Sequence, residues 1–154
     1  MLLTLTSPLS LYSIPVIWFS AFYPNTLKFL LIDKTLGYDN TLPRGNPNRL
    51  AAAESKREAA TPSEVSLRAQ RMDGAHMNGN ENFPLWVAAI LAGNLVGLDN
   101  YTLNTVSIAY VATRLLYNHI YINHNTVLKG WLRTIVFFSG LCMFQFSFSS
   151  RSIS

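Results

Sequence analysis

The chain has 154 residues and a formal net charge of +4, and 49% of its residues are apolar while only 13% are charged. Soluble domains carry about twice that charged fraction, so the composition argues against an ordinary water-soluble domain. Between Asp33 and Glu81 the charged residues are seven basic and seven acidic, which leaves no basic stripe for a nucleic acid. Cys142 is the only cysteine, which excludes an internal disulfide bond and a cysteine-based zinc site. His76 and His119 have no partners at metal-ligand spacing, so no metal site is predicted.

Four apolar stretches predict a single membrane domain over residues 9–148, made of four transmembrane helices. The stretch 9–32 is long enough, at about 1.5 Å per residue, to cross a hydrocarbon core of about 30 Å. A cleaved signal peptide is the alternative there, but no basic segment precedes the stretch and no clear small-residue cleavage site follows it. The other helices are predicted at 68–98, 101–122 and 130–150, with short tails at 1–8 and 151–154.

A polar loop at 33–67 separates the first two predicted helices. Its Asn, Pro and Gly residues between Tyr38 and Arg49 predict turns, and the segment from Ala51 to Glu64 is interpreted as a solvated tether or a short helix. The segments 33–82 and 123–133 fall on one side of the membrane and together hold nine basic residues. Because positive charge favours the cytoplasmic side, the long loop is predicted to be cytoplasmic and both termini to face away from it.

Polar residues form one helical face just before the second apolar stretch. Arg71, Ala75, Asn78 and Asn82 repeat at spacings of four, three and four, and Glu81 lies one turn from Asn78. An ionisable group at the centre of a membrane helix costs about 2.5 to 3.5 kcal/mol, so such groups usually have a partner or a function. A carboxylate and a carboxamide at this depth suit the amine and amide groups of a polar ligand.

A second polar cluster is predicted at the cytoplasmic end of the third and fourth helices. Arg114, Tyr117 and Tyr121 follow an i, i+3, i+7 pattern, and Lys129 and Arg133 open the next helix at the same depth. Arginine and lysine at helix ends often only reach toward the interface, and tyrosine is common in aromatic belts. Together with the first cluster at the same level, however, these residues favour a ligand site.

Three segments resemble the MAPEG family, the membrane-associated proteins of eicosanoid and glutathione metabolism. Residues 75–82 (AHMNGNEN) are similar to its A-H-x-N-x-x-E element, and residues 114–121 (RLLYNHIY) to its R-x-x-[YH]-x-x-x-Y element. Residues 38–44 (YDNTLPR) resemble a stretch found in fungal members. The resemblance extends from about Ile14 to Phe146, and the chain is similar to the fungal-type members and to the microsomal glutathione transferases.

This resemblance implies an all-α integral membrane protein: a left-handed bundle of four transmembrane helices, assembled as a homotrimer in the endoplasmic reticulum. Glutathione is the implied co-substrate, bound between subunits near the cytoplasmic face. Arg133 is expected beside its sulfur as the catalytic residue, supported by the hydroxyl of Tyr121. The residues expected to bind glutathione are Asn78, Glu81, Arg71, His76, Arg114, Tyr117 and Lys129.

The implied activity is that of a transferase or peroxidase, which activates the glutathione thiolate against a hydrophobic electrophile that arrives from the lipid bilayer. One alternative is a glutathione-using isomerase in a specialised pathway. Another is a non-catalytic member that binds lipid or scaffolds a partner, and Gly74 favours it, because the family usually has an arginine four residues before the asparagine. A purely structural four-helix membrane protein is the remaining alternative.

Overall fold

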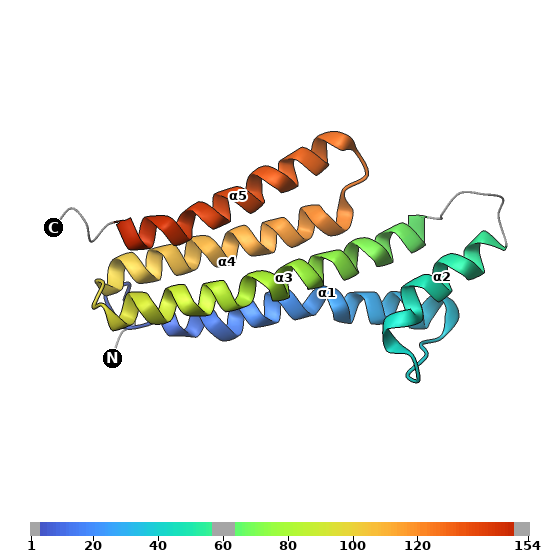
Figure 1. Cartoon of the computed structure of the whole chain (residues 1–154), viewed down its shortest axis with the longest axis horizontal. Coiled ribbons are helices and arrows are strands. Elements are labelled where there is room, and N and C mark those ends of the chain that lie inside the picture. The colour runs from blue at the N-terminus through green and yellow to red at the C-terminus, as the bar shows by residue number, and fades with distance from the viewer. Residues whose placement is uncertain (1–3, 57–63, 150–154) are drawn as a thin grey trace.

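Every regular element is helical within residues 4–56 and 64–149, the ranges that the computed structural model describes. The prediction of an all-α fold is therefore confirmed for this part of the chain. The four long helices lie side by side along the molecule, and the short α2 packs at one end (Figure 1). The α-helices are α1 (Ser13–Leu36), α2 (Asn46–Ser55), α3 (Glu64–Leu95), α4 (Asn100–Asn123) and α5 (Val127–Ser149).

Glycine and aspartate residues set the ends of the helices. Gly37, with φ of 75°, ends α1 and donates its N–H to the carbonyl of Asp33. Glycine adopts this left-handed conformation without steric cost. Helix α1 therefore continues four residues past the predicted end at residue 32, because the glycine and not the first charged residue stops it. At the start of α4, the carboxylate of Asp99 accepts a hydrogen bond of 2.9 Å from the N–H of Thr102, as a helix cap does.

Small residues and aromatic stacking hold the long helices together. A Cβ atom added to Gly79 in α3 would lie 2.6 Å from the Cβ of Ala21 in α1, so only glycine permits this close approach. Farther along, the indole of Trp86 in α3 stacks on Tyr110 in α4 with 4.1 Å between ring centroids. The same indole donates a hydrogen bond of 3.1 Å to Ser13 Oγ in α1. These contacts join α1, α3 and α4 into one packed core.

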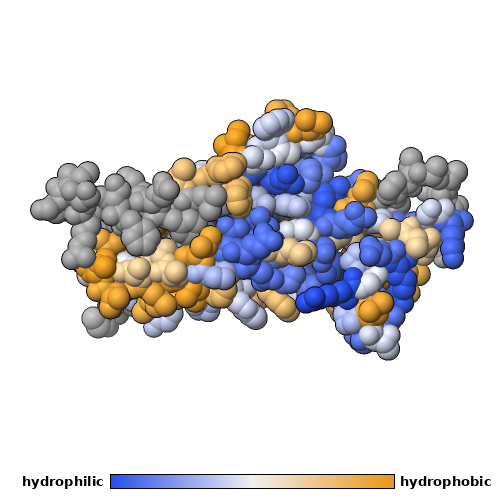
Figure 2. Space-filling view, viewed as in Figure 1, coloured by the Kyte–Doolittle hydropathy of each residue, from blue (hydrophilic) through white to orange (hydrophobic). Residues whose placement is uncertain are grey.

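Polar side chains are buried in the bundle while many apolar ones face outward. The buried polar residues of α3 and α4 include Asn82, Asn104, Ser107, Arg114 and Asn118. The visible surface is hydrophobic at the end where α1 begins and hydrophilic toward the end that carries α2 (Figure 2). Within the described residues, none of the helices combines the length and the apolar content needed to cross a membrane.

The segment between α1 and α2 is a closed turn held by one buried side chain. Asn46 Nδ2 donates to the carbonyls of Asp39, at 2.9 Å, and Pro43, at 3.0 Å, while its Oδ1 accepts from the N–H of Asp39. Hydrogen bonds from Thr41 hold the pKa of the Asp39 carboxyl below its usual value. The predicted turns are therefore an ordered turn, and the start of the segment interpreted as a tether or a short helix belongs to helix α2, while residues 57–63 of that segment lie outside the described residues.

Candidate functional site

A cavity of about 250 Å³ opens between α3, α4 and α5, and we refer to it as the tyrosine pocket. Four of the residues that the sequence singled out meet here, one from α3, two from α4 and one from α5. The residues that line the pocket are Asn78, Tyr117, Tyr121, Arg133, Thr134 and Phe137. The two polar clusters predicted from separate stretches of sequence thus face one another across a single cavity.

A buried arginine fixes the orientation of Asn78. Arg114 is only 4% exposed, its Nη2 donates a hydrogen bond of 3.1 Å to Asn78 Oδ1, and its guanidinium lies 4.7 Å from the centre of the Tyr117 ring. Asn82 Nδ2 donates to the backbone carbonyl of Asn78 at 2.8 Å. Among the described residues, none accepts a hydrogen bond from Asn78 Nδ2. The amide therefore presents its two N–H donors to the pocket, where a carbonyl or carboxylate oxygen of a ligand can accept them.

The guanidinium of Arg133 lies over an aromatic ring in the same pocket. Its Cζ is 4.7 Å from the centre of the Tyr121 ring, within the range of a cation–π interaction. Tyr121 in turn contacts Tyr117 edge-on, with 5.6 Å between ring centroids, and His124, with 5.9 Å. The Tyr121 ring thus orients a positive charge in the lining of the pocket, which suits an anionic ligand atom.

Glu81 and His76 face a different cavity, a depression of about 550 Å³ between α1, α3 and the turn before α2. His76 Nδ1 donates to the carbonyl of Ala21 at 2.8 Å, which links α3 to α1. An ion pair between Lys28 of α1 and Asp73 of α3 lines the same depression. The sequence analysis missed this pair, although Lys28 is the only charge in the first 32 residues. The predicted roles of Glu81 and His76 toward glutathione stay predictions.

The remaining predicted cations lie at the polar end of the bundle. Lys129 is exposed, its Nζ donates to Asn125 Oδ1 at 3.0 Å, and it is not among the residues that line the tyrosine pocket. Arg71 is mostly buried, and its Nε donates to the carbonyl of Ile122 at 3.1 Å. In the described part of the chain, no group of three or more His, Cys, Asp or Glu side chains is arranged to hold a metal ion.

Two residues of α5 that line the tyrosine pocket were not predicted from the sequence. Thr134 directly follows Arg133, and Phe137 lies one helical turn after it. The ring of Phe137 packs 5.9 Å from that of Tyr117. Phe137 could have been predicted, because it lies four residues after Arg133 and therefore on the same face of the helix. Nothing in the sequence distinguishes Thr134 from other threonines.

Residues 33–148 match the family model of the MAPEG family. The chain belongs to the MAPEG family. The match covers more than half of the chain and includes every residue that lines the tyrosine pocket. No curated protein and no solved structure matches the chain significantly. Family membership makes the chain a membrane-associated protein whose function is related to glutathione.

The position where MAPEG proteins usually carry an arginine is occupied by Gly74, and the structure explains why it has no side chain. A Cβ atom at this position would lie 2.5 Å from the hydroxyl oxygen and 3.0 Å from Cζ of Tyr121. Atoms cannot approach so closely, so a side chain at position 74 and the observed position of Tyr121 exclude each other. Gly74 thereby lets the Tyr121 ring rest against α3 beneath the guanidinium of Arg133.

We expect Gly74→Ala to destabilise the wild-type protein but to stabilise a Tyr121→Leu variant. Alanine is favoured over glycine in a helix by about 1 kcal/mol, and only the clash with Tyr121 opposes that gain. The measurement is the thermal unfolding midpoint in mild detergent for the two single variants and the double variant. Gly130→Ala is the matched control, because a Cβ atom at this helical glycine has no neighbour within 4 Å. Equal shifts from Gly74→Ala in both backgrounds would contradict the contact.

Proposed function

We propose that the tyrosine pocket binds glutathione and that Arg133 stabilises its thiolate for attack on an apolar electrophile. The observation that supports this most strongly is that Asn78, Tyr121 and Arg133 line one cavity, with the Arg133 guanidinium over the Tyr121 ring and Asn78 Oδ1 held by Arg114. Binding and activation of a peptide thiol require both hydrogen-bond donors and a positive charge. Amide donors bind its backbone oxygens, and a cation favours its sulfur as an anion.

The energetic demand on Arg133 is modest. A free thiol has a pKa of about 8.5 and is mostly protonated at neutral pH. Lowering that pKa by about two units requires about 2.7 kcal/mol of differential stabilisation. One charge-assisted hydrogen bond contributes about 1.5 to 3 kcal/mol, so a single well-placed guanidinium is sufficient. The Tyr121 hydroxyl adds a second donor for the same sulfur.

In the proposed reaction the thiol loses its proton to solvent and the thiolate attacks the electrophile. With an aryl halide, a carbon–sulfur bond forms and halide leaves, so that the product is a stable thioether. The same thiolate serves a peroxidase, in which it attacks the outer oxygen of a lipid hydroperoxide, the O–O bond breaks and the alkoxide leaves as the alcohol after taking a proton from solvent. A second glutathione then reduces the resulting sulfenic acid, which gives the disulfide and water. The thiolate also serves an isomerase, in which the sulfur adds and then leaves. The chain's own residues act identically in all three, by binding the peptide and stabilising the sulfur anion.

We also propose that the bundle lies in the endoplasmic reticulum membrane as a homotrimer, with residues 33–67 toward the cytoplasm. The exposed apolar side chains of the long helices support contact with lipid, and they include Trp18, Phe19, Leu91, Ile108 and Ile135. The hydrophilic end of the molecule carries the turn and α2 (Figure 2). An apolar electrophile dissolved in the bilayer then reaches the pocket between helices without crossing water.

The test is a conjugation assay with purified protein in mild detergent, with glutathione and 1-chloro-2,4-dinitrobenzene as a general aryl electrophile. We expect glutathione-dependent formation of the thioether above the uncatalysed rate. Analysis of products with unsaturated and hydroperoxide substrates then separates the three chemistries. A rearranged product that contains no sulfur indicates an isomerase, and an alcohol formed from a hydroperoxide indicates a peroxidase. Absence of any glutathione-dependent turnover would contradict the catalytic proposal and favour a lipid-binding or scaffold member.

A further inference from the structure

An apolar groove of about 430 Å³ lies at the end of the bundle opposite α2, where α1 and α4 begin (Figure 1). It is lined by the N-terminal segment (residues 4–12), the start of α1 and one stripe of α4. The residues of that stripe follow helical spacing, and they are Asn104, Ser107, Ile108, Val111, Ala112 and Leu115. Tyr117 and Tyr121, which line the tyrosine pocket, lie on another face of α4. The groove is therefore a separate cavity.

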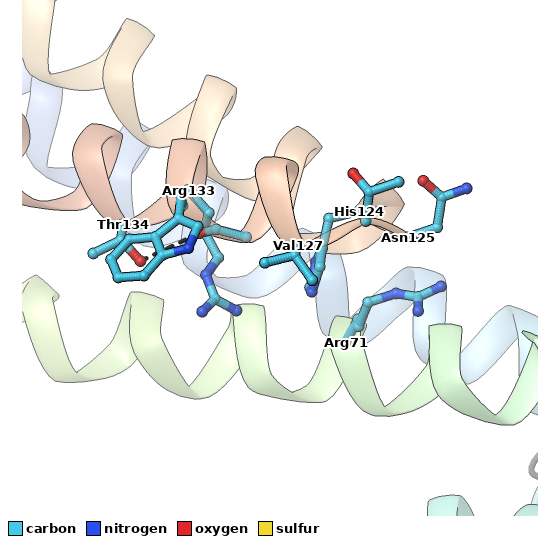
Figure 3. A pocket seen from close by; sticks show the side chains of 9 residues that line it. Arg71, His124, Asn125, Val127, Arg133 and Thr134 are labelled. Carbon is cyan, nitrogen blue, oxygen red and sulfur yellow. Dashed lines mark hydrogen bonds between the residues drawn. The ribbon is translucent and has the colours of Figure 1, made fainter.

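The groove differs in charge from the cavity beside the tyrosine pocket. In that cavity the side chains of Arg71, from α3, and Arg133, from α5, reach into the space between these helices (Figure 3). Among the described residues, no Asp, Glu, Lys, Arg or His lines the groove. A charged ligand group would lose its hydration there without gaining an opposite charge. The chemistry of the lining thus calls for an uncharged ligand.

Asn104 presents a fixed hydrogen-bond acceptor that has no partner. Its Nδ2 donates to the backbone carbonyls of Leu5 and Ser7, both at 2.6 Å, which holds the N-terminal segment against α4. Its Oδ1 is buried and accepts no hydrogen bond from any described residue. Because the two carbonyls require the N–H donors where they are, the amide cannot turn over to exchange its oxygen for its nitrogen. A donor from outside the described chain is needed to pair this oxygen.

Ser107, one helical turn after Asn104, carries a second polar atom without a partner. A hydroxyl within a helix often donates to a carbonyl of the preceding turn, as Thr113 Oγ1 does to the carbonyl of Ala109 at 2.8 Å. The buried Ser107 hydroxyl makes no such bond to any residue in the described ranges. Side chains three residues apart on a helix have Cβ atoms about 5 to 6 Å apart, so one ligand group can bond both. Buried polar atoms rarely stay unpaired, which indicates that a ligand supplies the missing partner.

An alcohol is the uncharged group that matches both atoms. Its hydrogen is donated to Asn104 Oδ1 while its oxygen accepts from the Ser107 hydroxyl. A ketone or an ester has no hydrogen to donate to the asparagine oxygen. From Asn104 to Leu115 the groove follows α4 over a length of about 16.5 Å. This is close to half of a hydrocarbon core of about 30 Å, the depth that one lipid chain spans in a leaflet.

We propose that the groove binds a single-chain lipid with an uncharged alcohol head group. The head hydroxyl lies between Asn104 and Ser107, and the chain follows α4 along Ile108 toward Leu115. These two apolar side chains are 60% and 47% exposed, so the lipid covers surface that the protein leaves open. Because the groove and the tyrosine pocket are separate, this inference goes beyond the proposed function and does not depend on glutathione binding.

The test is photolabelling of the purified protein with tetradecanol that carries a diazirine in the middle of its chain. A zwitterionic detergent without hydroxyl groups keeps the detergent from competing for the site. Peptide mass spectrometry locates the adducts, and unlabelled competitors give apparent affinities. We expect saturable adducts within residues 104–115 that tetradecanol displaces. Its methyl ether keeps the chain but lacks the O–H donor, so it should compete about fivefold more weakly.

Three variants test the location and the polar contact. Ala112→Phe places a ring in the groove and should abolish the saturable adducts. Ala88→Phe makes the same change at an exposed alanine of α3 outside the groove and should leave them unchanged. Ser107→Ala removes an unpaired hydroxyl, so the affinity for tetradecanol should fall about fivefold while the thermal unfolding midpoint does not fall.

Four results would overturn the inference. Absence of saturable adducts in the wild type means that no such lipid binds. Unchanged adducts in Ala112→Phe mean that the probe binds elsewhere. Equal competition by tetradecanol and its methyl ether means that the groove does not recognise a hydroxyl. A smaller oligomer in Ala112→Phe than in Ala88→Phe assigns the groove to contact with a second copy of the chain.

Discussion

Replacing Arg133 with alanine is expected to lower glutathione-dependent turnover by about 25-fold at neutral pH. Loss of the guanidinium raises the pKa of the bound thiol from about 6.5 to about 8.5, which lowers the thiolate fraction at pH 7 from about three quarters to about 3%. The rising limb of the pH–rate profile therefore moves to higher pH by about two units. This shift distinguishes an effect on the thiol from a general loss of folded protein, which would lower the rate at every pH.

The controls for Arg133 are a conservative variant and a distant one. Arg133→Lys keeps the charge but replaces a planar, forked donor with a single ammonium group, so we expect an intermediate rate. Arg68→Ala removes an equal charge from an exposed site on α3 and should leave the profile unchanged. If the Arg133→Ala variant keeps the wild-type rate and pH profile, Arg133 does not stabilise the sulfur.

Replacing Asn78 with aspartate is expected to weaken glutathione binding by at least tenfold while leaving the protein as stable as the wild type. The aspartate has the same shape, and its carboxylate accepts the hydrogen bond that Arg114 now donates to Asn78 Oδ1 at 3.1 Å. It lacks the two N–H donors that face the pocket, and its negative charge repels a ligand carboxylate. Loss of a hydrogen bond to a charged group costs about 1.5 to 3 kcal/mol, so affinity falls by at least tenfold.

Two further variants make the Asn78 experiment decisive. Asn78→Leu removes the partner of the buried Arg114 as well as the donors, so both binding and the thermal unfolding midpoint should fall. Asn48→Asp makes the same chemical change at an exposed position near the start of α2 and should alter neither. Unchanged glutathione affinity in Asn78→Asp would show that the amide donors of Asn78 do not contact the ligand.

Helix positions and one face of the site were predictable from sequence because they depend on local spacing. Apolar stretches located the four long helices, and the spacing of Asn78 from Arg71 placed both on one face of α3. The i, i+3, i+7 pattern from Arg114 to Tyr121 likewise put three side chains on the face of α4 that meets α3 and α5. In each case the residues belong to one helix, so their spacing in the sequence decides which face of that helix they share.

The contacts between elements were not predictable, because they depend on how the helices pack. The pairing of Lys28 with Asp73 joins residues from α1 and α3, and no sequence pattern links them. Glu81 lies one turn from Asn78, yet it faces the depression beside α1 while Asn78 faces α4. The contact between Tyr121 and Gly74 also depends on how α4 packs against α3. The sequence shows only that a glycine stands where an arginine was expected.

The most direct test of the central claim is calorimetric titration of the purified wild-type protein with glutathione. We expect saturable binding at millimolar glutathione or below. We also expect oxidised glutathione, which has no free thiol and twice the bulk, to bind more weakly. No saturable heat at millimolar glutathione would contradict the assignment of the tyrosine pocket as a glutathione site.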